Sequence, residues 1–265
     1  MSSLTPEQLS QYQQDGYISP IDIFSAEEVK IVRDEIESIE KNWPDELIGV
    51  GRNNVHMISP VFDEVVHNSK ILDAVEDLIG RDILAAGTTL FIKDPEKKSF
   101  VSWHQDAKYQ GFKPHNFVTA WVAITDSNKD NGCMLMWPGS HSEIKDHNDT
   151  FDENNILTRG QTVPIELKAG QMSLHHPLIV HGSGENKTND RRIGFVIQSY
   201  IGSDVDQVAG EVYVQQAIGE DPFKYHPHVP RPTETMNKDD LELRHKANED
   251  LQEILYKGSK EIRNL

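Results

Sequence analysis

Cysteine is almost missing from this sequence, because Cys133 is the only one among 265 residues. A single cysteine cannot form an intrachain disulfide, and it cannot supply the several thiolates of a structural zinc site. Any metal site must therefore use histidine, aspartate or glutamate. We expect Cys133 itself to be a small core residue.

Positive charge is also scarce, with 26 lysines and arginines against 43 aspartates and glutamates and a formal net charge of -17. This balance argues against a nucleic acid or an anionic membrane surface as the main partner. No run approaches the roughly 18 apolar residues of a membrane span, and no basic segment followed by an apolar one opens the chain. We therefore expect a cytoplasmic protein whose partner is a small molecule.

The composition is that of a globular protein, with 37% apolar residues. A chain of this length can bury one large core, so we expect a single domain over residues 1–265. Its predicted parts are a helical N-terminal part (1–80), a β-rich core (about 83–202) and a C-terminal extension with a helix (203–265).

Helix signals dominate the first third of the chain. Thr5 and Gln8 can form a capping box with Pro6 at the first helical position, and Gly16 would end that helix. A second capping box begins at Ser25 and precedes apolar residues at helical spacing, and a third helix is predicted over 69–79. Charged residues with leucines at helical spacing predict a terminal helix within 237–258.

From residue 83 the pattern changes to short β-rich runs separated by turn residues. The seven runs are "ILAAGTTLFIK", "FVSWHQD", "FVTAWVAIT", "CMLMWPGS", "TVPIELKAGQMSL", "LIVHGSG" and "RIGFVIQSYI". They predict a mainly β fold, a sandwich or jelly roll with flanking α-helices. The polar stretch 143–159 is predicted to be a long loop that serves as a lid.

One of these runs carries two ionisable groups two positions apart. In a strand, residues i and i+2 point to the same side, so His104 and Asp106 would project together and Gln105 would face away, unless the strand bends there. His181 could supply a third ligand, because a jelly roll brings distant strands side by side. Two histidines and one carboxylate describe the facial triad of non-haem Fe(II) oxygenases. Taken alone, the His104 and Asp106 pair could equally be a structural hydrogen-bonded pair.

Three longer motifs make a more specific pattern: "WHQD", "AWVAITDSNKDNGCMLMWPGSH" and "HGSGENKTNDRRIGF". In them the sequence resembles the phytanoyl-CoA dioxygenase (PhyH) family of Fe(II)/2-oxoglutarate-dependent oxygenases, over at least two-thirds of the chain. The resemblance implies a double-stranded β-helix (cupin-like) core with His104, Asp106 and His181 as iron ligands. It also implies that Arg192 pairs with the distal carboxylate of 2-oxoglutarate. Further positions that it assigns to cosubstrate binding are Ser183, Trp121, Lys93 and Thr89.

The resemblance further implies a reaction. 2-Oxoglutarate and O2 would be consumed, succinate and CO2 formed, and a substrate C–H bond hydroxylated, with ascorbate as a stimulating reductant. Relatives that halogenate have a small residue in place of the aspartate, so Asp106 favours hydroxylation. Halogenation, desaturation and a catalytically silent, metal-binding jelly roll are the alternatives.

Several neighbouring residues have open roles. His175 and His176 compete with His181 but lack its Gly-Ser and arginine context, and His175 is a candidate for contact with the metal ligands or the substrate. Gln105 could simply pack, but it is a candidate substrate contact, because strand bends at metal sites often turn both faces inward. Arg191 is expected at the surface or in an ion pair, since adjacent strand residues face opposite ways.

The substrate is expected to be a small soluble metabolite. Lys93, Lys108 and Lys113 could suit an anionic compound, such as an organophosphonate or an amino-acid-like molecule. For the lysines near His115 the simpler interpretation is a solvated face. The chain could act as a monomer or a homodimer.

Overall fold

The computed structural model describes residues 3–95, 98–147, 155–156 and 160–255. Its helices are α1 (Pro6–Asp15), α2 (Ala26–Asn42), α3 (Pro60–Val66), α4 (Ser69–Ile79), α5 (Ala107–Gln110) and α6 (Lys238–Leu255), with short 3-10 turns η1 (Gly49–Arg52), η2 (Val55–Met57) and η3 (Ser140–Ser142). Its strands are β1 (Tyr17–Asp22), β2 (Ile83–Ala85), β3 (Thr88–Lys93), β4 (Val101–His104), β5 (Phe112–Lys113), β6 (Phe117–Ala123), β7 (Met134–Trp137), β8 (Val163–Ile165), β9 (Gln171–His175), β10 (Val180–Ser183), β11 (Arg192–Gly202), β12 (Asp206–Gln207) and β13 (Gln215–Ile218).

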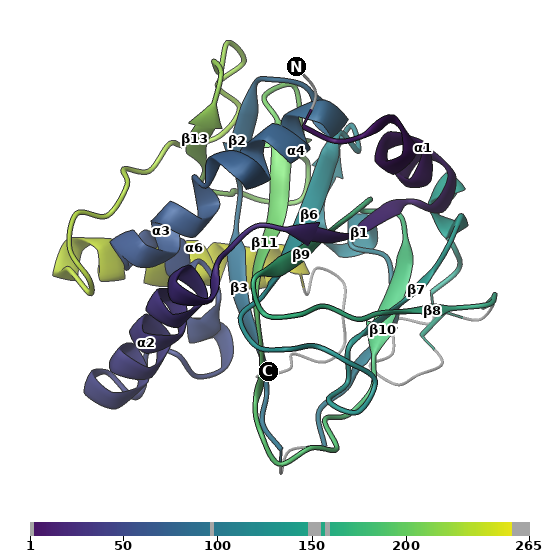
Figure 1. Cartoon of the computed structure of the whole chain (residues 1–265). Helices are drawn as coiled ribbons and strands as arrows, with labels where there is room; N and C mark the ends of the chain where they lie inside the picture. Colours follow the sequence, from purple (N-terminus) through teal and green to yellow (C-terminus); the bar gives the residue numbers. More distant parts are fainter. Residues whose placement is uncertain (1–2, 96–97, 148–154, 157–159, 256–265) are drawn as a thin grey trace.

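Most strands belong to two antiparallel sheets. The larger sheet has the order β1-β9-β6-β11-β2-β13, with β3 also paired to β11, and the smaller has the order β4-β10-β7-β8. Helices α2, α3 and α4 lie on one side of the larger sheet and the smaller sheet lies on the other (Figure 1). This is the predicted mainly β architecture with flanking helices.

Strand alternation separates the two faces of the larger sheet. Ile193, Phe195 and Ile197 of β11 point outward and join the main core with the apolar residues of α2, α3 and α4. The intervening residues of β11 point inward, where Trp121 and Val196 pack against Met134 and Met136 of the smaller sheet. The space between the two sheets is therefore walled by both and is the natural place for a site.

The N-terminal helix signals are confirmed. Thr5 and Ser25 each form the predicted capping box, and Gly16 ends α1 in the left-handed conformation at φ 84°. The third helix spans the predicted 69–79. Within the part expected to be helical, however, Tyr17–Asp22 is a strand that pairs with β9. The chain turns at Gly16, and the edge of the larger sheet supplies the partner that the local sequence does not reveal.

The strand signals are largely confirmed, with two runs divided. "ILAAGTTLFIK" forms both β2 and β3, and "TVPIELKAGQMSL" forms both β8 and β9, each interrupted by a positive-φ glycine, Gly87 or Gly170. The short strands β5, β12 and β13 have no clear sequence signal. Within the predicted lid (143–159), Asn155 and Ile156 are buried. Residues 148–154 and 157–159 of that stretch lie outside the described residues.

The predicted terminal helix is α6, which packs against α5 and the η1 and η2 turns. Its fully buried Arg244 donates hydrogen bonds to the backbone carbonyls of Glu46 and Gly51. Residues 256–258 of the predicted helix lie outside the described part of the chain. No helix that the structure describes is long and apolar enough to cross a membrane.

Candidate metal centre

Two neighbouring strands of the smaller sheet bring together three potential metal ligands. β4 and β10 are antiparallel, and their register places His104 directly opposite His181. Asp106 follows two residues after His104, at the start of α5. This pairing closes the long sequence gap that separates His181 from the other two residues.

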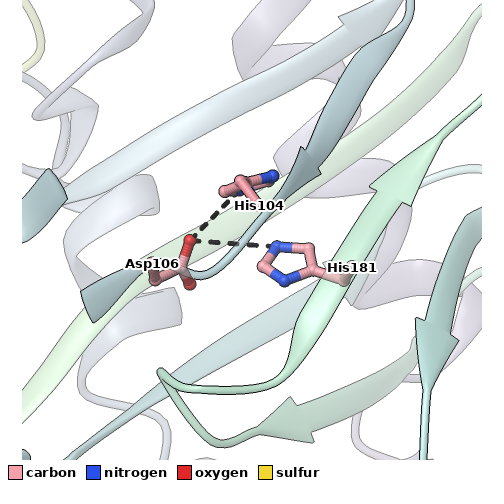
Figure 2. A group of neighbouring side chains, drawn as sticks. All are labelled: His104, Asp106 and His181. Carbon is pink, nitrogen blue, oxygen red and sulfur yellow. Dashed lines mark ion pairs between the residues drawn. The ribbon is translucent and has the colours of Figure 1, made fainter. Parts of the chain in front are cut away.

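The three side chains converge on one point (Figure 2). The Asp106 Oδ1 atom lies 3.3 Å from His104 Nε2 and 3.8 Å from His181 Nε2. One ligand atom from each residue lies within 4.8 Å of the others. Two imidazole nitrogens and one carboxylate oxygen at this separation can bind a metal ion on one face.

Backbone carbonyls orient both imidazoles. His104 Nδ1 lies 2.8 Å from the carbonyl of Ser102, and His181 Nδ1 lies 3.1 Å from the carbonyl of Ile179. A carbonyl only accepts hydrogen bonds, so each Nδ1 carries a proton. Burial disfavours the charged form of His104, but Asp106 outweighs it and raises the pKa of this imidazole. In the neutral form of each ring, Nε2 holds the lone pair. This is the tautomer that a metal ligand needs.

Burial and neighbouring charges put His181 and Asp106 in the states that metals bind. Burial, with His104 close by, lowers the pKa of His181 to about 3, so its imidazole is neutral at neutral pH. Burial disfavours the charged form of Asp106, but His181 and His104 outweigh it and hold its pKa well below the usual value. Asp106 is therefore a carboxylate.

Of the two geometries considered for His104 and Asp106, the flat strand is wrong, whereas a bend, the alternative, is present and the two side chains meet. β4 ends at His104, and Asp106 has helical backbone angles of φ -55° and ψ -43°. A turn, and not a flat strand, brings the carboxylate beside the imidazole. The residue between them therefore has no simple alternation to follow.

Gln105 is directed into the protein, where it is fully buried. Its amide nitrogen donates hydrogen bonds to the carbonyls of Glu143 and Leu178, and its Oε1 accepts one from the backbone N–H of Lys145 at 2.7 Å. Both amide hydrogens are thus used by the backbone. This geometry speaks against the expected substrate contact and for a role in holding the ligand segment.

Two residues of the larger sheet support Asp106 from the other side. Thr119 Oγ1 donates to Asp106 Oδ2 at 3.0 Å, and His175 Nε2 lies 3.5 Å from the same oxygen. His175 is thus next to a ligand, as one of its predicted roles requires. Thr119 was not predicted. It faces inward because β6 pairs with β9 in the register that places Thr119 opposite His175, and the local sequence does not reveal this register.

A pair of buried cations lies in the same space between the sheets. Arg192 and Lys93 are register partners on β11 and β3, and their exposed fractions are only 1% and 3%. Lys93 Nζ donates to Ser183 Oγ at 2.8 Å and also to the carbonyl of Gly184. Ser183 and the ligand His181 are two residues apart on β10, and their register partners on β7 are the inward-facing Met134 and Met136. The two cations and the metal ligands therefore both lie in the space between the two sheets.

Arg192 is held in place by a backbone carbonyl and an aromatic ring. Its Nη1 donates to the carbonyl of Gly132 at 2.6 Å, and its guanidinium lies 5.2 Å from the ring centre of Trp121. Burial lowers the pKa of Arg192 to about 10, so it stays charged at neutral pH. Burial and the charge of Arg192 lower the pKa of Lys93 to about 7.

Neither cation forms an ion pair with a carboxylate among the residues that the structure describes. Buried charges of one sign are costly unless an opposite charge accompanies them. The pair therefore suits an anion, and an arginine fork suits a carboxylate in particular.

The remaining predicted residues lie farther from this centre. Thr89 points inward, but its hydroxyl donates to Asn53 Oδ1 at 2.6 Å. Lys108 is exposed on α5, and Lys113 Nζ lies 2.8 Å from His115 Nε2. Arg191 forms ion pairs with Glu40 and Asp94, as predicted for a residue facing away from the site, and Cys133 is buried.

Comparison with known proteins identifies the family. Residues 12–194 match the profile of the family described as Phytanoyl-CoA dioxygenase (PhyH). A Stutzerimonas stutzeri protein described as a probable alpha-ketoglutarate-dependent hypophosphite dioxygenase is 27% identical over 237 residues, covering 77% of this chain and 81% of that protein. The peroxisomal phytanoyl-CoA dioxygenase of Bos taurus is 26% identical over 231 residues, covering 71% of this chain and 66% of that protein.

Solved structures show the same fold. The apo form of the non-heme monooxygenase ThoJ is 28% identical, with a TM-score of 0.81 over 94% of this chain and 97% of that one. CytC3, solved with Fe(II) and alpha-ketoglutarate, is 22% identical, with a TM-score of 0.69 over 86% of this chain and 93% of that one. The predicted jelly-roll core is confirmed. The chain therefore belongs to the phytanoyl-CoA dioxygenase family and is an Fe(II)- and 2-oxoglutarate-dependent dioxygenase.

Proposed function

We propose that this protein hydroxylates a C–H bond of a small metabolite, with succinate and CO2 as coproducts. The observation that carries the proposal is the arrangement of His104, Asp106 and His181 beside the buried pair of Arg192 and Lys93, which forms no ion pair with a carboxylate of the described residues. A metal triad leaves coordination positions open, and the cation pair offers a place for the far carboxylate of a dicarboxylate cosubstrate.

Each residue has a defined task in this proposal. His104, Asp106 and His181 hold Fe(II) through Nε2, Oδ1 and Nε2. The guanidinium of Arg192 and the ammonium of Lys93 bind the distal carboxylate of 2-oxoglutarate, and Ser183 Oγ offers it a further hydrogen bond. Trp121 keeps the guanidinium in position by stacking against it.

Bound iron and 2-oxoglutarate together would supply the activation of O2 and the oxidising power. The protein contributes a dry and rigid enclosure for them. Apolar residues from both sheets, among them Met134, Met136 and Val196, pack around the inner face and exclude water. The fixed imidazole tautomers and the Thr119 hydrogen bond orient the ligands before any metal arrives.

Halogenation and a silent role both fit this site less well. A halide would need the coordination position that the carboxylate of Asp106 occupies, and Asp106 converges with the two histidines. A protein without turnover would have no need for a buried cation pair beside a complete triad. Desaturation uses the same residues as hydroxylation and is distinguished by the product formed.

The test is the formation of succinate from 2-oxoglutarate with Fe(II), O2 and ascorbate, first without and then with candidate metabolites. We expect slow succinate formation by the wild-type protein that a substrate stimulates. His104→Ala should abolish it, whereas Lys30→Met, on the exposed face of α2, should leave it unchanged. No turnover in the wild type, or equal turnover in His104→Ala, would refute the oxygenase assignment.

A further inference from the structure

A small recess lies next to the metal centre, where α5, β11 and α6 meet. Gln110, Gln198, Ser199 and Gln207 form its polar side, and Phe112 and Leu251 are among the apolar residues opposite. We propose that this recess binds one uncharged hydrogen-bonding group of the substrate, such as a carboxamide, a carbonyl or a hydroxyl. The proposal rests on the proposed function and adds the chemical class of the group that the enzyme recognises.

The recess is tied directly to Asp106. The backbone N–H of Gln110 donates to the carbonyl of Asp106 at 3.1 Å, so Gln110 lies one helical turn beyond that residue. On the other side, Thr119 Oγ1 lies 3.0 Å from Asp106 Oδ2 and 2.8 Å from the carbonyl of Gln198. The backbones of Gln110 and Gln198 therefore both lie around Asp106, and a group held by their side chains would be part of a substrate that extends from the ligand triad into the recess.

Two carboxamides in the recess still have hydrogen-bonding capacity. The side chain of Gln198 makes no hydrogen bond with any residue that the structure describes, and Gln198 lines the recess at the point where the register of β11 shifts. Gln110 accepts a hydrogen bond from Ser199 Oγ at 2.8 Å through Oε1, which leaves its amide nitrogen as a donor. Together they offer a donor and an acceptor to one incoming group.

Gln207 differs from these two, because both its amide nitrogen and its amide oxygen already have backbone partners. Its Nε2 donates to the carbonyl of Gln110, and its Oε1 accepts from the N–H of Ala209, each at 2.8 Å. It holds the strand β12 against α5 and forms the wall of the recess. Gln110 and Gln198 are thus the two residues available for recognition.

The lining argues for an uncharged group. Among the described residues that line the recess there is no lysine, arginine, aspartate, glutamate or histidine. A carboxylate or phosphonate placed there would lose its hydration without meeting an opposite charge, which is strongly unfavourable. The three lysines that could suit an anion lie elsewhere: Lys93 is beside Arg192, Lys108 is exposed, and Lys113 lies next to His115.

The size of the recess limits what enters it. Its cavity volume is about 20 Å³, which is room for about one water-sized group. The recess therefore binds a single functional group, while the rest of the substrate lies outside it. A hydroxyl, or the oxygen of a carbonyl or amide, has the right size and can accept hydrogen bonds from the amide nitrogens of Gln110 and Gln198.

Most of the recess is formed by residues after the part that matches the family profile. That match ends at residue 194, whereas Gln198, Ser199, Gln207 and the α6 residue Leu251 follow it. The metal and cosubstrate residues all lie within the match. The recess can therefore give this chain a substrate specificity that differs from that of its relatives.

The experiment follows the side-chain amide resonances of Gln198 and Gln110 by NMR in the full-length protein loaded with Zn(II) and 2-oxoglutarate. The probes are acetamide, ethanol, acetate and methylphosphonate. We expect acetamide to shift both resonances with a dissociation constant on the order of 1–100 mM, as suits so small a ligand. Acetate and methylphosphonate should have no saturable effect.

Variants test whether the two glutamines do the binding. Gln198→Leu and Gln110→Leu should each weaken acetamide binding about tenfold, the effect of losing one or two neutral hydrogen bonds. The control Gln171→Leu removes a glutamine whose amide bonds Asp22 on the far edge strand, and it should bind acetamide as the wild type does. Binding in the variants is followed through the backbone resonance of Ser199.

The outcomes separate this proposal from the oxygenase assignment. Stronger binding of acetate or methylphosphonate than of acetamide, or no shift with acetamide up to about 0.5 M, would overturn the recess proposal. Acetamide binding that survives in both leucine variants would also overturn it. Succinate formation by the same preparations with Fe(II) reports on the oxygenase chemistry independently of these shifts.

Discussion

The side-chain amide of Gln105 donates a hydrogen bond to the backbone carbonyl of Leu178. Gln105 separates the ligands His104 and Asp106, and Leu178 precedes the ligand His181 by three residues. One carboxamide therefore joins the two segments that carry the triad. Its other hydrogen bonds, to Glu143 and Lys145, attach the start of the 143–159 stretch to the same point.

This relationship predicts that Gln105→Leu weakens metal binding. Leucine fills a similar volume but cannot bridge the three backbone groups, so the two ligand segments lose their common anchor. We expect the dissociation constant for Fe(II) or Co(II) to rise about 10- to 100-fold, the usual effect of removing a group that supports metal ligands. Titration of the metal-free protein with Co(II), followed by its visible absorption, measures the change.

Gln215→Leu is the matched control for this experiment. Gln215 is also buried and also donates to a backbone carbonyl, that of Pro230, but it lies on β13, away from the ligands. Both variants should unfold at lower temperature than the wild type, and only Gln105→Leu should bind Co(II) more weakly. Equal metal affinity in the two variants would mean that Gln105 contributes to stability alone.

Arg231→Met tests how the C-terminal extension is attached. Arg231 forms hydrogen-bonded ion pairs with the buried Asp63 of α3 and with the exposed Glu64. Its loss would leave the carboxylate of Asp63 buried beside His67 without its arginine. Because Arg231 is itself half exposed, we expect a moderate decrease of about 2 kcal/mol in the free energy of unfolding.

Chemical denaturation of both proteins measures this decrease. Lys30→Met is the control, because the ion pair of Lys30 with Asp34 is exposed on α2 and should be worth less than about 0.5 kcal/mol. A decrease for Arg231→Met no greater than that of the control would show that the extension does not depend on this ion pair.

Motif spacing and local signals predicted much of this molecule. The capping boxes of α1 and α2 and the third helix depend on neighbours in the sequence, so they could be located from it directly. The sequence also pointed to His104, Asp106 and His181, which converge as expected.

What could not be predicted depends on contacts between distant segments. β1 is a strand because β9 provides an edge for it, and Thr119 supports Asp106 because β6 and β9 share a register. The direction of Gln105 depends on a turn after β4 and on carbonyls far along the chain. A period-two pattern contains no information about such a turn. A bend could equally turn Gln105 toward a substrate or pack it into the protein, and the structure shows it packed.

Gly194→Ala tests the support of Arg192 by Trp121. A Cβ atom on Gly194 would overlap the Trp121 ring, which is buried and cannot move freely. The ring must tilt, and the guanidinium stacked on it must shift. We expect the dissociation constant for 2-oxoglutarate to rise about tenfold and the free energy of unfolding to fall by about 1–3 kcal/mol.

Calorimetric titration of the Zn(II)-loaded variant with 2-oxoglutarate measures the first effect. The affinity for the metal itself is the internal control, since the triad does not touch Gly194, and it should stay within about twofold of the wild-type value. Unchanged affinity for 2-oxoglutarate in a destabilised variant would separate Trp121 packing from cosubstrate binding.

The buried Lys93 predicts that 2-oxoglutarate binding weakens as the pH rises. Burial and the charge of Arg192 lower the pKa of Lys93 to about 7, while Glu185 and Cys133 act in the opposite direction. Below this pKa the ammonium is present and attracts the distal carboxylate; above it the amine is neutral. The distal carboxylate of bound 2-oxoglutarate favours the ammonium form and raises the pKa of Lys93. Above about pH 7, the protein therefore takes up a proton when it binds 2-oxoglutarate.

The expected result is a dissociation constant for 2-oxoglutarate that is flat below about pH 7 and then rises, at most tenfold per pH unit. Both carboxylates of the ligand are ionised throughout this range, and Arg192, with a pKa of about 10, remains charged. The measurement is calorimetric titration at saturating Zn(II) between about pH 6.5 and pH 9. Lys93→Met should bind weakly at every pH and lose the slope, because methionine keeps the chain length without the titrating group. A wild-type slope that persists in Lys93→Met would assign the proton to another group and remove Lys93 from the cosubstrate site.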